Sequence, residues 1–244
     1  MITRATAAHA TLLRGRINNL RKTRCRRDFV FTPTDRTKMS ATAIASGLAG
    51  LGGVATGLGV MAVDTTEEAD LIEFDLGDVR LKAWLWVSVF EEGDEVEVVA
   101  EQGEAGWIGY GIRRVSDRIV ALHPHCSRGR SAHFRASARW WFTITAALLV
   151  FMYALIAGLA LLESMTNWTE LLKVGALGGA GLAMILAVVA YRISARYAGF
   201  ATLAECIFQV FGWPNVRNID LPAITKTHKK PGDPGGLGIL FFRY

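Results

Sequence analysis

Two long uncharged apolar runs dominate the second half of the chain. The first covers residues 140–162 and the second residues 174–191, with a short polar linker between them. A helix needs about 20 apolar residues to cross the hydrocarbon core of a bilayer, and a buried soluble helix is rarely apolar on every face. The pattern therefore predicts a transmembrane helical hairpin over residues 140–191.

A third apolar run, residues 39–63, has a different composition. It is uncharged but consists mainly of glycine, alanine, serine and threonine, and Ala45, Ala49, Gly53 and Gly57 share one helical stripe. Small-residue stripes are typical of helices that pack closely or oligomerise. We predict a Gly/Ala-rich apolar helix that is re-entrant or enters the membrane conditionally, and a soluble segment remains the alternative.

Between residues 70 and 122 the hydrophobic period changes to two. Ile72, Phe74 and Leu76 alternate with charged residues, and Gly77 opens a tight turn before a second alternating stretch. Three further strand-like stretches follow, of which residues 118–122 are the last. Five short antiparallel strands with regular turns are typical of a small OB-like barrel, predicted over residues 64–127.

The remaining segments are assigned by their composition. The basic N-terminal segment, residues 1–38, is expected to join the β domain or to contact anionic lipid headgroups. Residues 192–213 predict an amphipathic juxtamembrane helix, and residues 214–244 a loop and strand that pack on the β domain. The predicted fold class is an α+β membrane protein, with an OB-like barrel, a transmembrane hairpin and an extra apolar helix.

Small residues also recur at intervals of about four along the two hairpin helices. They are Ala154 and Gly158 in the first helix, and Gly175, Gly179 and Ala183 in the second. Such positions allow close helix approach. The chain is therefore expected to form a homo-oligomer within a lipid bilayer.

Charge sets the expected orientation of the hairpin. The net charge is +5, and the cations beside the hairpin are Arg128, Arg130, Arg135 and Arg139 before it and Arg192 and Arg196 after it. Residues 128–139 therefore form a basic connector, whereas the linker between the helices is acidic. By the positive-inside rule, both termini are predicted to be cytoplasmic. Trp140, Trp141 and Trp168 stand where aromatic side chains anchor helices at the membrane interfaces.

Several classes of function are disfavoured. Neither span carries a deep ionisable residue, as a carrier or proton pump usually requires. The barrel region is acidic, which makes nucleic acid an unlikely ligand although Trp84, Trp86 and Trp107 are available for stacking. Three scattered cysteines favour the reducing cytoplasm.

Residues 122–135 concentrate histidine and cysteine in a turn-prone stretch before the hairpin. Candidate zinc ligands are His123, His125, Cys126 and His133, but structural zinc sites commonly add cysteine pairs that are missing here. Ser127 and Ser131 lie near these histidines without the sequence context of a nucleophile. We therefore predict no enzyme, metal or cofactor, and interpret the stretch as a membrane-proximal connector.

The chain resembles a family described as type VI secretion system effectors of Gram-negative bacteria. The resemblance rests on residues 92–101, 122–130, 212–215 and 230–244, and extends over nearly the whole sequence. It implies a multi-pass protein of the bacterial inner membrane with a role in interbacterial competition. The implied partners are a secretion-system component, a chaperone or an immunity protein.

Two hypotheses follow. In the first, the protein is an effector that inserts in a recipient's inner membrane, oligomerises through its small-residue stripes and dissipates the membrane potential. In the second, it is a resident inner-membrane interaction or immunity protein whose cytoplasmic β domain binds a protein partner.

Overall fold

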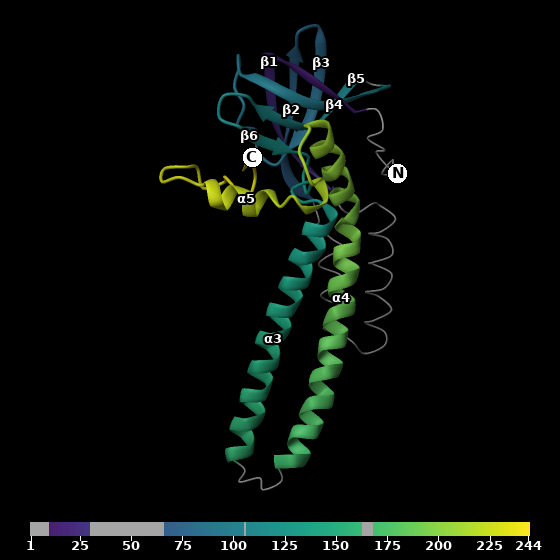
Figure 1. The fold of residues 1–244 in the computed structure, drawn as a ribbon, viewed down its shortest axis with the longest axis vertical. Helices are drawn as coiled ribbons and strands as arrows, with labels where there is room; N and C mark the ends of the chain where they lie inside the picture. The colour runs from purple at the N-terminus through teal and green to yellow at the C-terminus, as the bar shows by residue number, and fades with distance from the viewer. Residues whose placement is uncertain (1–9, 30–65, 105, 163–167) are drawn as a thin grey trace. The chain divides into compact units, whose positions relative to one another are not determined.

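The computed structural model describes residues 10–29, 66–104, 106–162 and 168–244. The chain divides into two compact units. One consists of Met1–Gly129 together with Phe200–Tyr244, and the other of Arg130–Gly199. Figure 1 shows strands in the first unit and long helices in the second.

Five strands of the first unit close into a barrel. They are β1 (Thr11–Arg27), β2 (Glu67–Leu76), β3 (Val79–Leu85), β4 (Glu95–Gly103) and β5 (Gly106–Arg114). Around the ring the order is β3-β2-β1-β4-β5, and a parallel pairing between β3 and β5 closes it. The prediction of an α+β chain with a small β-barrel is confirmed.

The hairpin of β2 and β3 shows how the alternating pattern produces this barrel. Ile72, Phe74 and Leu76 are buried in the barrel core, while the charged residues between them face outward. Gly77 adopts a φ of 61°, a conformation that glycine reaches without steric cost. Leu76 therefore pairs directly with Val79 across the predicted turn.

The fifth strand of the ring is the basic strand β1, whereas the sequence pattern predicts residues 118–122 in that role. Its first half pairs with β4 and its second half with β2, on either side of an irregularity near Asn19. There the backbone N–H groups of Asn19 and Leu20 donate to the Glu92 carboxylate at 2.7 and 2.9 Å. Strand pairing uses backbone groups, so a strand with mostly polar side chains can complete a barrel.

Strand β6 (Ile119–Leu122) extends the sheet beyond the ring. It pairs with β5 at Gly111–Arg113, past the region that β3 occupies, and with the short strand β7 (Phe242–Arg243). The predicted return of the C-terminal strand to the β domain thus takes place at β6.

The predicted segments 192–213 and 214–244 differ from the structure in their secondary structure. The predicted juxtamembrane helix is the continuous end of helix α4 (Trp168–Val210). The predicted loop contains η2 (Val216–Asn218) and helix α5 (Leu221–His228), which begins where the Asp220 side chain accepts a hydrogen bond from Ala223 N–H at 3.3 Å. These segments build a second hydrophobic core around Phe208, Trp213 and Leu221.

The second unit consists of helix α3 (Arg130–Leu162) and the part of α4 up to Gly199. Both helices are long and apolar enough to cross a membrane. Their boundaries include the basic residues on either side of the apolar runs, because arginine is a good helix former and continues the helix without interruption.

Candidate functional site

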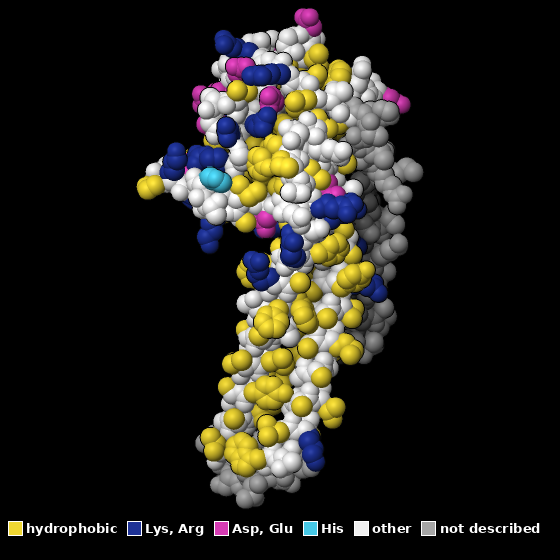
Figure 2. All heavy atoms as spheres, in the orientation of Figure 1, with side chains coloured by type: hydrophobic (Ala, Val, Ile, Leu, Met, Phe, Trp, Pro, Cys, Tyr) yellow, Lys and Arg dark blue, Asp and Glu magenta, His cyan; other side chains and the backbone are white. Residues whose placement is uncertain are grey.

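Helices α3 and α4 carry large apolar side chains on their surfaces. Trp140 is 68% exposed, Val150 71% and Leu177 77%, and Figure 2 shows yellow side chains along the visible face of both helices. Burial of each such side chain would contribute about 1.5–3 kcal/mol. Large exposed apolar surfaces of this kind are typical of sites that contact a membrane or another protein.

The two helices meet at a notch made by glycines of α4. A Cβ added to Gly175 would lie 3.0 Å from Tyr153 Cε1, and one added to Gly179 would lie 3.1 Å from the Tyr153 hydroxyl. The Tyr153 side chain of α3 therefore fills the space that these two predicted packing glycines leave. The sequence stripe did not reveal this aromatic partner.

The predicted small residues of α3 face elsewhere. Ala154 is exposed, and a Cβ added to Gly158 would meet no described atom within 4 Å. Ala183 of α4 is half-buried. These α3 positions remain available for contact with a second molecule, and their role in oligomerisation stays a prediction.

A polar contact joins the basic ends of the same helices. His133 Nε2 of α3 lies 3.1 Å from both the hydroxyl and the carbonyl oxygen of Ser194 in α4. The Ser194 hydroxyl in turn donates to Ser137 Oγ at 3.1 Å. The sequence analysis identified His133 but missed Ser194. Ser194 is a single serine between Arg192 and Arg196, and no pattern in the neighbouring sequence shows that it lies at a contact between helices.

The other two histidines of residues 122–135, His123 and His125, lie in an aromatic cluster of the first unit. The His123 ring meets Phe29 edge-on at 5.5 Å, and the His125 ring meets Trp86 at 5.0 Å. Burial lowers the pKa of His123 to about 4, so its imidazole is neutral at physiological pH. The cluster is therefore part of the packing around the barrel.

His125 also contacts Glu67, the first residue of β2. Its Nε2 lies 2.8 Å from the Glu67 carboxylate, and its backbone φ of 68° falls in the left-handed region. A non-glycine residue in that region usually needs surrounding contacts to hold it there. The hydrogen bond to Glu67 and the Trp86 contact provide them.

The arrangement places the candidate zinc ligands in different surroundings. Within the described ranges, no three histidine, cysteine, aspartate or glutamate side chains gather as a metal site would require. Burial raises the pKa of the Cys126 thiol, which keeps it protonated. Ser127 is held through its carbonyl oxygen, which accepts a hydrogen bond from Leu221 N–H at 3.1 Å.

The arginines near the helices have separate roles. Arg128 pairs with Asp220 at 3.0 Å within the first unit. Arg130, Arg135 and Arg139 belong to the first three turns of α3, and Arg192 and Arg196 belong to α4. Trp168 is exposed at the start of α4, whereas Trp141 is partly buried. A charged band thus precedes the apolar part of α3.

The predicted apolar helix with Ala45, Ala49, Gly53 and Gly57 lies outside the described residues. The described part of the chain ends at Phe29 before this segment and resumes at Thr66 after it. Arg27, at the end of β1, pairs directly with Glu67, at the start of β2. The chain therefore leaves and re-enters the barrel at neighbouring positions.

The first unit also contains a cavity of about 400 Å³ that the sequence did not indicate. Its lining includes Arg113, Arg118, Trp213 and Tyr244. The Trp213 and Tyr244 rings stack with centroids 3.8 Å apart, and Arg113 is held by an ion pair with Glu97. A cavity lined by aromatic rings and arginine side chains can accommodate part of a protein partner.

Comparisons with protein-family models, curated proteins and solved structures find no match for this chain.

Proposed function

We propose that the protein is an integral protein of the bacterial inner membrane. Helices α3 and α4 cross the membrane as a hairpin, both termini are cytoplasmic and the barrel is of the OB type. The observation that carries the proposal is the exposure of large apolar side chains along both helices. The orientation rests on the arginines at one end and the acidic linker at the other.

We further propose that the protein acts as a type VI secretion system effector. It inserts in a recipient's inner membrane, oligomerises through outward-facing small residues and permeabilises or depolarises that membrane. Gly158 of α3 and Gly178 and Gly181 of α4 support this, because added Cβ atoms there would meet no described neighbour within 4 Å. Close packing between copies can use such positions.

The alternative is a resident membrane protein whose cytoplasmic unit binds a protein partner, such as an immunity or secretion-system protein. The cavity beside Trp213 and Tyr244 favours this alternative. Rings and guanidinium groups of this kind are common at the centres of protein interfaces. The two proposals share the membrane anchor and differ in whether membrane damage follows.

Directing the chain to the periplasm of a sensitive cell separates them. The effector proposal predicts loss of membrane potential and of growth, measured with a potential-sensitive dye and by cell counts. A Val150→Lys/Met184→Lys variant should lose the effect, since a lysine at a helix centre costs about 2.5–3.5 kcal/mol on insertion. Both wild-type side chains are highly exposed.

The matched control is Leu12→Lys/Ile108→Lys, which adds the same charge at exposed apolar positions of the barrel. It should depolarise cells as the wild type does. If the wild-type chain reaches the membrane fraction and leaves both potential and growth unchanged, the effector proposal fails and the resident alternative stands.

A further inference from the structure

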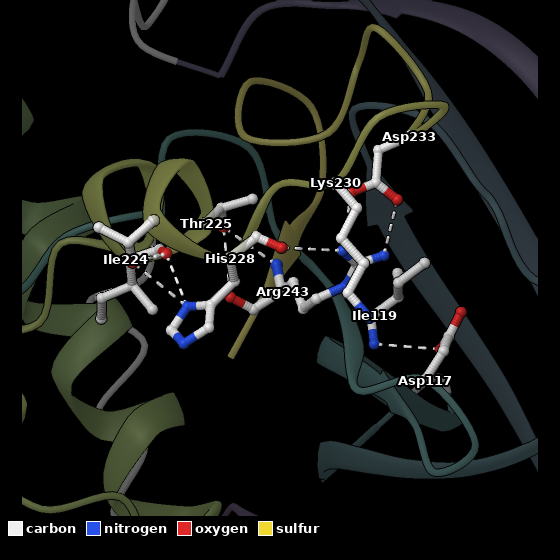
Figure 3. A network of polar contacts seen from close by, with 9 residues as sticks. Asp117, Ile119, Ile224, Thr225, His228, Lys230, Asp233 and Arg243 are labelled. Carbon is white, nitrogen blue, oxygen red and sulfur yellow. Dashed lines mark hydrogen bonds and ion pairs between the residues drawn. The ribbon is translucent and has the colours of Figure 1, made fainter.

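The C-terminal part of the first unit forms a small lobe from η2, α5 and the following loop to β7, residues 216–243. Arg243 fixes its shape. Figure 3 shows the Arg243 guanidinium reaching Asp233, at 2.8 and 3.0 Å, and the His228 carbonyl oxygen, at 3.3 Å. The Thr225 hydroxyl accepts from the Arg243 N–H at 3.0 Å. The loop is therefore held against α5.

The lobe carries more positive than negative charge. Its cations are Arg217, Lys226, Lys229, Lys230 and Arg243, and its acids are Asp220 and Asp233. Both carboxylates are already paired, Asp220 with Arg128 and Asp233 with Arg243. Figure 2 shows dark blue side chains in the region that α5 occupies in Figure 1.

The remaining cations are exposed to solvent. Within the described residues, the side chains of Arg217, Lys226 and Lys229 form no ion pair. Ile239, in the loop of the same lobe, is 71% exposed. Exposed lysines and exposed aliphatic side chains are both typical of surfaces that lie at a lipid headgroup layer.

The lobe contacts the residues that lead directly into α3. A Cβ on Gly129 would lie 2.1 Å from the Val216 carbonyl oxygen, so the two backbones touch. Gly129 N–H donates to the Ile219 carbonyl oxygen at 3.0 Å. Because α3 starts at Arg130, only ten helical residues, about 15 Å, separate this contact from Trp140.

From these observations we infer that the lobe binds the anionic phospholipid surface of the membrane that α3 enters. Lys226, Lys229 and Lys230 supply the charge, and Ile239 supplies an apolar contact. The inference rests on the proposed membrane insertion of α3. It assigns the C-terminal lobe a lipid-binding role distinct from that of the hairpin.

The test uses the full chain in nanodiscs of phosphatidylcholine alone or mixed with phosphatidylglycerol. An environment-sensitive dye is attached at Ile239→Cys, with Cys25→Ser and Cys206→Ser to remove the accessible native thiols. We expect a blue-shifted, brighter signal only with the anionic lipid, abolished by 1 M salt. Each of Lys226→Gln, Lys229→Gln and Lys230→Gln should lower the docking equilibrium about fivefold, the equivalent of about 1 kcal/mol.

The matched control removes the same charge from β1, with Arg16→Gln, Arg21→Gln and Lys22→Gln, and should keep the anionic response. Incorporation into nanodiscs is measured on the same samples. If the chain does not incorporate into either lipid, the membrane proposal itself fails. If it incorporates and the dye responds equally to both lipids, or equally in the lysine variants, the lobe does not bind anionic headgroups.

Discussion

The titration of His123 is coupled to its burial in the folded chain. Its pKa is lowered from 6.5 to about 4 by burial, so the unfolded chain binds a proton at higher pH than the folded chain. The first unit should therefore lose stability as the pH falls from about 6.5 to about 4. Over the whole pH range, the free energy of unfolding should fall by at most about 3 kcal/mol.

A His123→Leu variant should show a flatter dependence of stability on pH across this window. Denaturant unfolding of the full chain in detergent, followed by tryptophan fluorescence at pH 7 and pH 4.5, measures it. An unchanged dependence would mean that His123 is hydrated in the folded protein. His228, on the exposed part of α5, provides the control as His228→Leu.

Gly129 is a residue at which the backbones of the connector and the lobe are in close contact. An alanine Cβ would lie 2.1 Å from the Val216 carbonyl oxygen and 2.8 Å from that of Arg217, which no side-chain rotation relieves. Gly129→Ala should therefore destabilise the first unit by about 1–3 kcal/mol. Thermal unfolding measured by near-ultraviolet circular dichroism gives the value.

Gly235→Ala is the matched control, because its added Cβ meets no described atom within 4 Å and its φ is ordinary. It should leave stability unchanged or raise it slightly. Equal melting of the two variants would contradict the close backbone contact between the connector and η2.

At the scale of elements, Tyr153 of α3 packs against Gly175 and Gly179 of α4. Gly175→Leu/Gly179→Leu should displace Tyr153 and weaken the hairpin by about 1–3 kcal/mol. The measurement is the helical circular dichroism signal during thermal unfolding in detergent.

The control for this pair is Gly178→Leu/Gly181→Leu, in which the added side chains point to open space in the described structure. As a monomer in detergent, this variant should have a helix melting temperature close to that of the monomeric wild type. If it lowers the helix melting temperature as much as the first pair does, the helices do not pack through the Tyr153 notch.

At the scale of the whole molecule, the parts of the candidate site were predictable to different degrees. The long helices and the β2–β3 hairpin follow from patterns within one stretch of sequence. The histidine stretch was recognised, but its contacts were not, because His125 meets Glu67 and His133 meets Ser194 across separations of 58 and 61 residues. Nothing local marks those partners.

By itself, the sequence determined that two helices are apolar on all sides and that alternating strands form a small barrel. These properties depend on which side chains are apolar, and the spacing of apolar residues along one stretch of sequence shows this directly. Only the tertiary structure decided that basic β1 completes the ring, that Tyr153 fills the glycine notch and that Arg243 shapes a basic lobe beside Gly129. Those outcomes depend on backbone pairing, shape and charge contacts between distant segments, which one stretch of sequence does not contain.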